Sequence, residues 1–219
     1  MTALQLDAAS DARYWPVPLL RAVPLLVLGM VITFVNNHST DIGLLTFGLT
    51  TAVAGMVLMY GSRRWLDDSG SRTLAMVQGA FGFVMGVVAI LFRGGGVPTL
   101  VAVVTFWALV SGVLELVSGL RRRRRSALGR DWMIVGAITL ILAIAYLVVP
   151  ADYSKELGGI EKIHGTLTSS TILVGLVGAY GALVGVFLVI QGLSLRWQGT
   201  DASVAEATTD PTIDGAHRP

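Results

Sequence analysis

The residues best able to do chemistry are four polar side chains inside long apolar runs: Arg21, Gln78, Glu115 and Gln191. Glu115 comes six residues before Arg121, so it lies roughly 9 Å along a helix from that charged end. The other three lie at a similar depth. A lone carboxylate or guanidinium inside a membrane costs about 3 kcal/mol, so each needs a partner. We predict that Arg21 pairs with Glu115, and that both glutamines add hydrogen bonds.

Such an intramembrane cluster has two interpretations. It could be a station for protons or a small solute, or a structural clasp that fixes the order of the helices. A relay needs polar groups through the whole membrane, and the opposite half of the runs offers only hydroxyl groups. These are Thr33, Thr46, Thr50, Thr51, Thr105 and Ser111. The clasp is the favoured interpretation, and the relay stays open as the alternative.

Two further sets of residues could respond to the surroundings of a membrane protein. His38 and His164 fall in loops on one side, and an unperturbed histidine titrates near pH 6.5, so either could sense acid or have no role. The other set is the run Arg121, Arg122, Arg123, Arg124 and Arg125. Arginines at a membrane surface attract anionic headgroups by about 1 kcal/mol each, which predicts lipid contact. No aromatic residues are interleaved, so nucleic-acid binding is not expected.

No pattern typical of catalysis occurs in the chain. There is no HExxH, GxSxG or phosphate-binding loop, and no histidine–carboxylate cluster with metal spacing. The absence of cysteine excludes disulfides, thiolate metal sites and cysteine nucleophiles. We therefore expect a protein that is not an enzyme, with no catalytic residue, cofactor or metal.

The elements that position these residues are evident from composition. Of 219 residues, 53% are hydrophobic and only 14% are charged, and mean hydropathy is +0.70. Soluble domains carry about 25% charged residues, so a soluble enzyme, a nucleic-acid module and a disordered protein are excluded. Six apolar runs are long enough to span a bilayer as helices. They are Val17–Phe34, Ile42–Tyr60, Thr73–Phe92, Val97–Leu120, Asp131–Val149 and Ser170–Leu195.

The distribution of basic residues predicts the orientation. One side of the six runs receives 13 of the 16 lysines and arginines, and the other receives only Arg93, Lys155 and Lys162. By the positive-inside rule the arginine-rich side is cytoplasmic, which places both termini there. We expect residues 1–16 to be a cytoplasmic segment, residues 17–196 the membrane domain of a multi-pass inner-membrane protein, and residues 197–219 a disordered cytoplasmic tail.

Small residues repeat along the chain. Gly79 and Gly86 follow Ala22 and Gly29 by 57 residues, and the third odd-numbered helix has Gly136 at the same offset. We therefore predict an all-α fold of three repeated helical hairpins, 17–60, 73–120 and 131–195, of which the last has a long outer loop at 150–169. Glycines seven residues apart share one helix face, which favours close helix packing, with a pore lining as the alternative.

This architecture resembles the HdeD-like acid-resistance membrane protein family. The closest segments are "WALVSGVLELVSGLRRR" at Trp107–Arg123 and "DWMIVGAITLILAIAYLVVP" at Asp131–Pro150. The chain departs from the family in its first outer turn, "VNNHSTDIG", which has no proline, and in its longer third outer loop. The resemblance implies a role in withstanding acid stress and brings no catalytic residues.

Three functions follow as hypotheses. The first is a non-enzymatic membrane protein that supports acid or envelope stress tolerance. The second is a transporter or channel for protons or a small solute, and the third is an accessory subunit of an envelope or lipid assembly machine. Membrane lipids are the expected partners, with a second copy of the chain or another membrane protein as further candidates.

Overall fold

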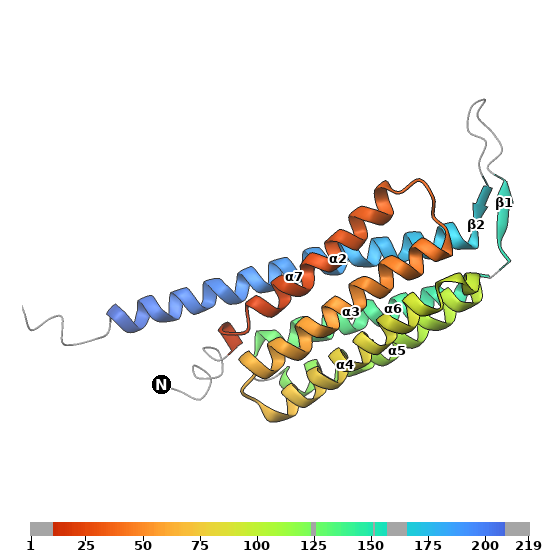
Figure 1. Ribbon diagram of the computed structural model, residues 1–219. Helices are drawn as coiled ribbons and strands as arrows, with labels where there is room; N and C mark the ends of the chain where they lie inside the picture. The colour runs from red at the N-terminus through yellow and green to blue at the C-terminus, as the bar shows by residue number, and fades with distance from the viewer. Residues whose placement is uncertain (1–10, 124–125, 151, 157–165, 209–219) are drawn as a thin grey trace, which may run out of the picture.

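The computed structural model describes residues 11–123, 126–150, 152–156 and 166–208. Within these ranges six long α-helices run side by side, joined by one 3-10 turn and two short strands (Figure 1). In chain order the elements are α2 (Pro16–Phe34), α3 (Thr40–Trp65), α4 (Ser69–Leu91), η1 (Arg93–Gly95), α5 (Gly96–Arg122), α6 (Ala127–Val148), β1 (Ser154–Glu156), β2 (Thr166–Thr168) and α7 (Ser169–Thr208).

All six helices are long and apolar enough to cross a membrane. At most 44% of their most apolar windows is buried inside the bundle. Large apolar side chains instead face outward, among them Phe34 at 77%, Leu91 at 72% and Val148 at 72% exposure. Such a surface suits acyl chains rather than water. The prediction of an all-α membrane protein with six spans is therefore confirmed.

Polar caps set where the helices begin, just outside the apolar runs. The side chains of Ser39, Asp68 and Ser126 accept hydrogen bonds from backbone N–H groups in the first turns of α3, α4 and α6, at 3.4, 2.7 and 3.3 Å. Such caps satisfy amide groups that have no partner within the helix. The helices are consequently several residues longer than the apolar runs.

Glycines bring three pairs of helices into backbone contact. A Cβ atom placed on Gly55 of α3 would lie 2.5 Å from the carbonyl oxygen of Gly79 on α4. A Cβ atom on Gly136 of α6 would lie 2.7 Å from the amide nitrogen of Leu116 on α5, and one on Gly181 of α7 would lie 2.8 Å from the carbonyl oxygen of Leu25 on α2. Small residues allow this approach in lipid, where apolar surface alone does not hold helices together. The packing role of the glycine stripes is confirmed.

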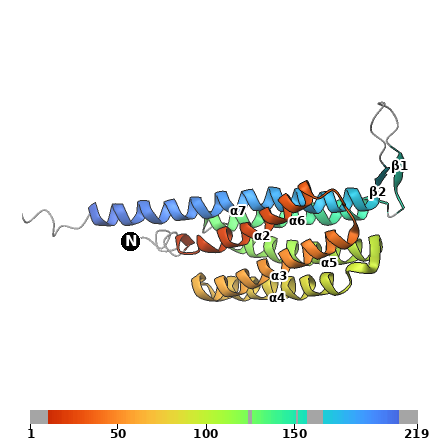
Figure 2. The same ribbon diagram turned by 45° about the horizontal axis from the view of Figure 1, so that its top comes forward.

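The closest pairs are not the predicted hairpins. The most extensive contacts join α3 with α4, α5 with α6, and α7 with α2, so they lie between successive repeats and between the last repeat and the first. Figure 2 shows the third of these pairs, α7 along α2, although the two helices lie at opposite ends of the chain. The helices within each hairpin, such as α2 and α3, touch less. The three repeats thus close into a ring.

The second helix of each repeat lies toward the middle of this ring, since α3, α5 and α7 also contact one another. The main core contains Phe47 of α3, Val104 of α5, Tyr146 of α6 and Val177 of α7. It fills the half of the bundle nearer β1 and β2, called here the β-hairpin half (Figure 1). The opposite end, called the arginine-rich end, carries Arg63, Arg64, Arg72, Arg121, Arg123 and Arg196.

The third outer connection is more ordered than a simple loop. Strands β1 and β2 pair in antiparallel register, with Ser154 opposite Thr168. The hydroxyl of Ser169 donates to the carbonyl oxygens of Pro150 and Tyr153 at 2.9 and 3.0 Å. These bonds tie the beginning of the connection to the start of α7. The tip, residues 157–165, is outside the described residues.

One boundary prediction is wrong. Residues 197–219 were expected to be disordered, but α7 continues as a helix to Thr208. A long membrane helix supplies the nucleus that an isolated segment lacks, so glutamine, alanine and glutamate residues can extend it into a polar region. Low apolar content therefore does not mark the end of this helix. Residues 209–219 lie outside the described residues.

Candidate polar site and central cavity

The structure brings Arg21 of α2 and Glu115 of α5 together. The Nη1 group of Arg21 donates to Oε1 of Glu115 at 3.0 Å, and the two side chains are only 12% and 5% exposed. They are 94 residues apart in the sequence, and their side chains meet inside the bundle. Because a buried charge without a partner is costly, each of the two groups depends on the other.

Gln78 of α4 is a second hydrogen-bond donor to the Glu115 carboxylate. Its Nε2 group donates to the second oxygen of Glu115 at 3.0 Å. Gln78 follows Arg21 by the 57-residue repeat offset, so these two donors occupy equivalent positions on their helices. The third equivalent is Val135, and the positions equivalent to Glu115 in the other repeats hold Leu58 and Leu188. The scaffold occurs three times, whereas the polar site is built once.

Gln191 does not join this cluster. It is buried, but no described hydrogen bond links it to Arg21, Gln78 or Glu115, and its Nε2 group has no partner among the described residues. The prediction matched its depth along the helix but could not fix the face it occupies. The polar site therefore consists of three of the four predicted residues.

A second ion pair lies at the arginine-rich end, between two residues that no sequence pattern had linked. Arg122 donates to Oδ1 of Asp11 at 2.7 Å, and its guanidinium lies 5.8 Å from the ring centre of Trp132. Tyr14 packs edge-on against the same tryptophan at 6.0 Å. Burial raises the pKa of the Tyr14 phenol, so this group stays neutral at physiological pH.

The arginine run accordingly divides into different roles. Arg122 is mostly buried in its contact with Asp11, which leaves little of its side chain for the predicted contact with anionic lipid. Arg121 and Arg123 are exposed, as a headgroup contact requires. Arg124 and Arg125 lie outside the described residues. The sequence shows five consecutive arginines, but it does not show that the helix directs Arg122 into the bundle.

Of the two histidines predicted to respond to pH, the structure describes only His38. His38 is half-buried in the connection between α2 and α3, and His164 lies outside the described residues. A salt bridge joins Arg93 to Asp41 at 3.5 Å, and both side chains are more than half exposed. Within the described residues, no three histidine, aspartate or glutamate side chains come together as a metal site would require.

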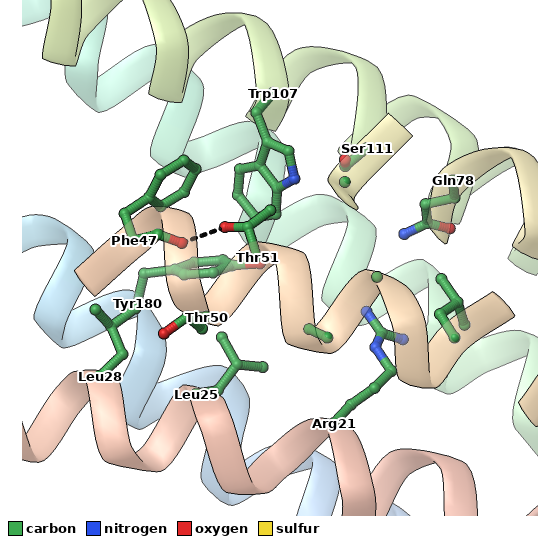
Figure 3. A pocket seen from close by; sticks show the side chains of 14 residues that line it. Arg21, Leu25, Leu28, Phe47, Thr50, Thr51, Gln78, Trp107, Ser111 and Tyr180 are labelled. Carbon is green, nitrogen blue, oxygen red and sulfur yellow. Dashed lines mark hydrogen bonds between the residues drawn. The ribbon is translucent and has the colours of Figure 1, made fainter. Parts of the chain in front are cut away.

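A cavity of about 40 Å³ lies beside the polar site, at the centre of the bundle. Figure 3 shows it bounded at one end by Arg21, Gln78, Ser111 and Trp107. The other end is closed by aromatic, apolar and hydroxyl side chains, namely Leu25, Leu28, Phe47, Thr50, Thr51 and Tyr180. No sequence pattern marked this cavity, because its lining comes from five separate helices.

At the end of the cavity beside the polar site, some hydrogen-bond donors of the lining have no acceptor among the other lining residues. Thr51 donates to the carbonyl oxygen of Phe47 at 2.6 Å, and Tyr180 shares a hydrogen bond with Thr139 at 2.9 Å. In contrast, Figure 3 shows no hydrogen bond from the Trp107 indole or the Ser111 hydroxyl to another residue of the lining. The buried Nε group of Arg21 also has no partner among the described residues.

One family model matches part of this bundle. Residues 77–148 match the family described as a short repeat of unknown function (DUF308). The matched segment includes most of α4 and all of α5 and α6. No curated protein matches the chain, and no solved structure does so.

Proposed function

We propose that this chain is a non-enzymatic integral protein of the cytoplasmic membrane, of the HdeD-like type, which helps the cell to tolerate acid and envelope stress. The observation that carries the proposal is the repeat match at residues 77–148. It falls within the second and third copies of the repeat that builds the bundle. The resemblance to HdeD-like proteins rests on the same threefold architecture.

The packing of the bundle favours a clasp over a relay at the polar site. Arg21 and Gln78 engage both carboxylate oxygens of Glu115. Beyond the central cavity, the main core fills the β-hairpin half mostly with apolar side chains. Such a bundle would keep its shape and remain tight to protons when the exterior is acidified. The polar site would then serve the integrity of the protein rather than a flux through it.

Survival after acid challenge tests the proposed process. A strain that lacks the protein should survive less well than the wild type, and a plasmid copy should restore survival. Glu115→Gln keeps the shape of the side chain but removes its charge, so it should lower the membrane abundance of the protein and survival together. Immunoblots of the same cells measure abundance. A deletion strain with unchanged acid survival would refute the proposed role.

We further propose that both termini are cytoplasmic, because the arginine-rich end carries most of the basic residues. The chain has no cysteine, so single-cysteine variants report the orientation directly. Asn36→Cys and Asp67→Cys replace exposed residues in connections at opposite ends of the bundle. In intact cells a membrane-impermeant maleimide should label Asn36→Cys, and should label Asp67→Cys only after permeabilisation. The reverse pattern would overturn the orientation.

The central cavity favours a second candidate function, the transport of a small solute. Arg21 lines the cavity and also holds Glu115, so occupation of the cavity could be coupled to the ion pair. The two functions differ in one outcome of the survival experiment. A Glu115→Gln protein that reaches normal abundance but does not restore survival would favour transport.

A further inference from the structure

The residues just before α2 form a separate segment, residues 11–15, at the arginine-rich end of the bundle. Its described backbone hydrogen bonds link close neighbours in the sequence, for example the N–H group of Tyr14 with the carbonyl oxygen of Asp11 at 3.0 Å. Helix α2 then begins at Pro16. Proline suits the first turn of a helix, because it has no N–H group that would need a partner there. The segment can therefore move without unwinding α2.

Side chains hold the segment 11–15 against three other helices, through Arg122 of α5, Trp132 of α6 and Arg196 of α7. Asp11 accepts a hydrogen bond from Arg122 at 2.7 Å, and the two side chains are only 6% and 13% exposed. The ring of Tyr14 packs edge-on against Trp132, with 6.0 Å between the ring centres. The ring centre of Trp15 lies 5.3 Å from the guanidinium of Arg196. These contacts place the segment across the end of the bundle.

A second, smaller cavity of about 10 Å³ borders the polar site. Its lining includes all three residues of the polar site together with Leu58, Ala75, Ser118 and Trp132. Tyr14 is only 1% exposed and packs in one apolar cluster with Leu58, Ala75 and Trp132. Its phenol also interacts electrostatically with Arg21, Glu115 and Arg122. Tyr14 therefore adjoins both the polar site and the ion pair of Arg122 with Asp11.

The observed position of the segment 11–15 combines favourable and unfavourable contributions. Burial of the Tyr14 ring and the ion pair of Asp11 with Arg122 favour it. Against it, the Tyr14 hydroxyl and the Nη1 group of Arg122 are buried without a partner among the described residues. Buried polar groups without a partner are costly, and water would satisfy both groups if the segment moved outward. Opposed contributions of this kind allow a second, open position.

We propose that the segment 11–15 is a removable plug, held by the ion pair of Asp11 with Arg122, which controls the access of water to the polar site from the arginine-rich end. When the ion pair opens and Tyr14 leaves its place beside Trp132, water enters the smaller cavity and reaches Glu115. The main core keeps the β-hairpin half closed in both positions, so water has access from one side only. This inference goes beyond the proposed role in stress tolerance and does not depend on it.

Removal of the Asp11 charge is expected to open the plug rather than to unfold the bundle. Arg122 lies in the last turn of α5, and its neighbours Arg121 and Arg123 are exposed. Its long side chain can therefore turn outward to water once Asp11 no longer holds it. Asp11→Asn nearly keeps the size of the side chain and removes its charge, so this substitution releases the plug with the smallest change in packing.

Cysteine labelling measures the access of water to the smaller cavity, since the chain has no cysteine of its own. Ser118→Cys places a thiol in the lining of this cavity. Thr105→Cys is the matched control, because Thr105 is buried on the same helix in the β-hairpin half. The full chain in lipid nanodiscs is treated with a positively charged methanethiosulfonate, and mass spectrometry follows the reaction. Ser118→Cys should react slowly, and about tenfold faster when Asp11→Asn is added, because the reactive thiolate forms in contact with water. Thr105→Cys should react slowly with or without Asp11→Asn.

An exchange of charges tests whether the ion pair itself holds the plug. Asp11→Lys combined with Arg122→Glu restores an ion pair in the reverse sense, so Ser118→Cys should again react slowly. Equal rates for Ser118→Cys with and without Asp11→Asn would overturn the proposal, as would fast labelling of Ser118→Cys in the otherwise unchanged chain. A parallel rise for Thr105→Cys would mean that the whole bundle loosens and that no plug exists. If the Asp11→Asn protein cannot be purified, Tyr14→Ala removes the buried ring of the plug and should raise the rate for Ser118→Cys alone.

Discussion

Glu115→Leu, made alone, is expected to lower the free energy of unfolding by about 3–5 kcal/mol, the loss typical of a buried ion pair that loses one partner. The substitution leaves the Arg21 guanidinium, 12% exposed, without a counter-charge inside the bundle. It also removes the acceptor of Gln78. Thermal unfolding of the detergent-purified protein, followed by circular dichroism, measures the loss, and membrane abundance in cells should fall in parallel.

The matched control removes both charges. Arg21→Met with Glu115→Leu leaves no unpaired ion, and such replacements of buried pairs are often neutral or stabilising. The chain itself supports this choice, because leucine already occupies both positions equivalent to Glu115, at Leu58 and Leu188. The double variant should therefore regain most of the lost stability. If it is as unstable as Glu115→Leu alone, the pair is not the source of the loss.

The second large effect is expected at the contact between α3 and α4. In Gly86→Ala the new Cβ atom would lie 2.5 Å from the carbonyl oxygen of Gly48 and 2.6 Å from the amide nitrogen of Ala52. Both neighbours are backbone atoms, so the helices must separate and lose contacts along their length. Overpacking of this kind costs about 1–3 kcal/mol. The melting temperature should fall accordingly.

Gly175→Ala on α7 is the matched control for this prediction, because it makes the same change of residue in open space. Alanine favours the helix more than glycine does, so the control should melt at or slightly above the wild-type temperature. Equal melting temperatures for the two variants would show that the close approach of α3 and α4 does not stabilise the protein.

Hydropathy was sufficient to predict the spans. The Arg21–Glu115 contact was predicted from two opposite charges at a similar depth in these spans. A membrane requires long apolar helices, and a buried charge requires an opposite one, so both predictions follow from strong physical constraints. The glycine stripes predicted which helix faces pack closely. They did not identify the partner of each face, because a stripe of small residues fits any other stripe. The pairing of α7 with α2 therefore appeared only in the structure.

The remaining features depend on how each helix is rotated about its own axis relative to its neighbours. The spacing of residues along the sequence does not give this rotation. Gln191 shares the depth of Glu115 and is buried, yet its Nε2 group has no partner among the described residues, and Arg122 turns inward while Arg121 and Arg123 do not. The central cavity is defined by Trp107, Ser111 and Tyr180, whose types are common in membrane helices and carry no separate signal. Its existence depends on how five helices leave space between them.

The contact between α7 and α2 has a consequence for how the protein is made. Helices enter the membrane in the order of synthesis, so α3 with α4 and α5 with α6 can associate as soon as each second helix has been inserted. Helix α2 is the first of the six to be inserted, yet its closest partner is the last. Until α7 has been inserted, the face of α2 that packs against the glycines of α7 lies against lipid. Closure of the ring therefore waits until the last of the six helices has been inserted.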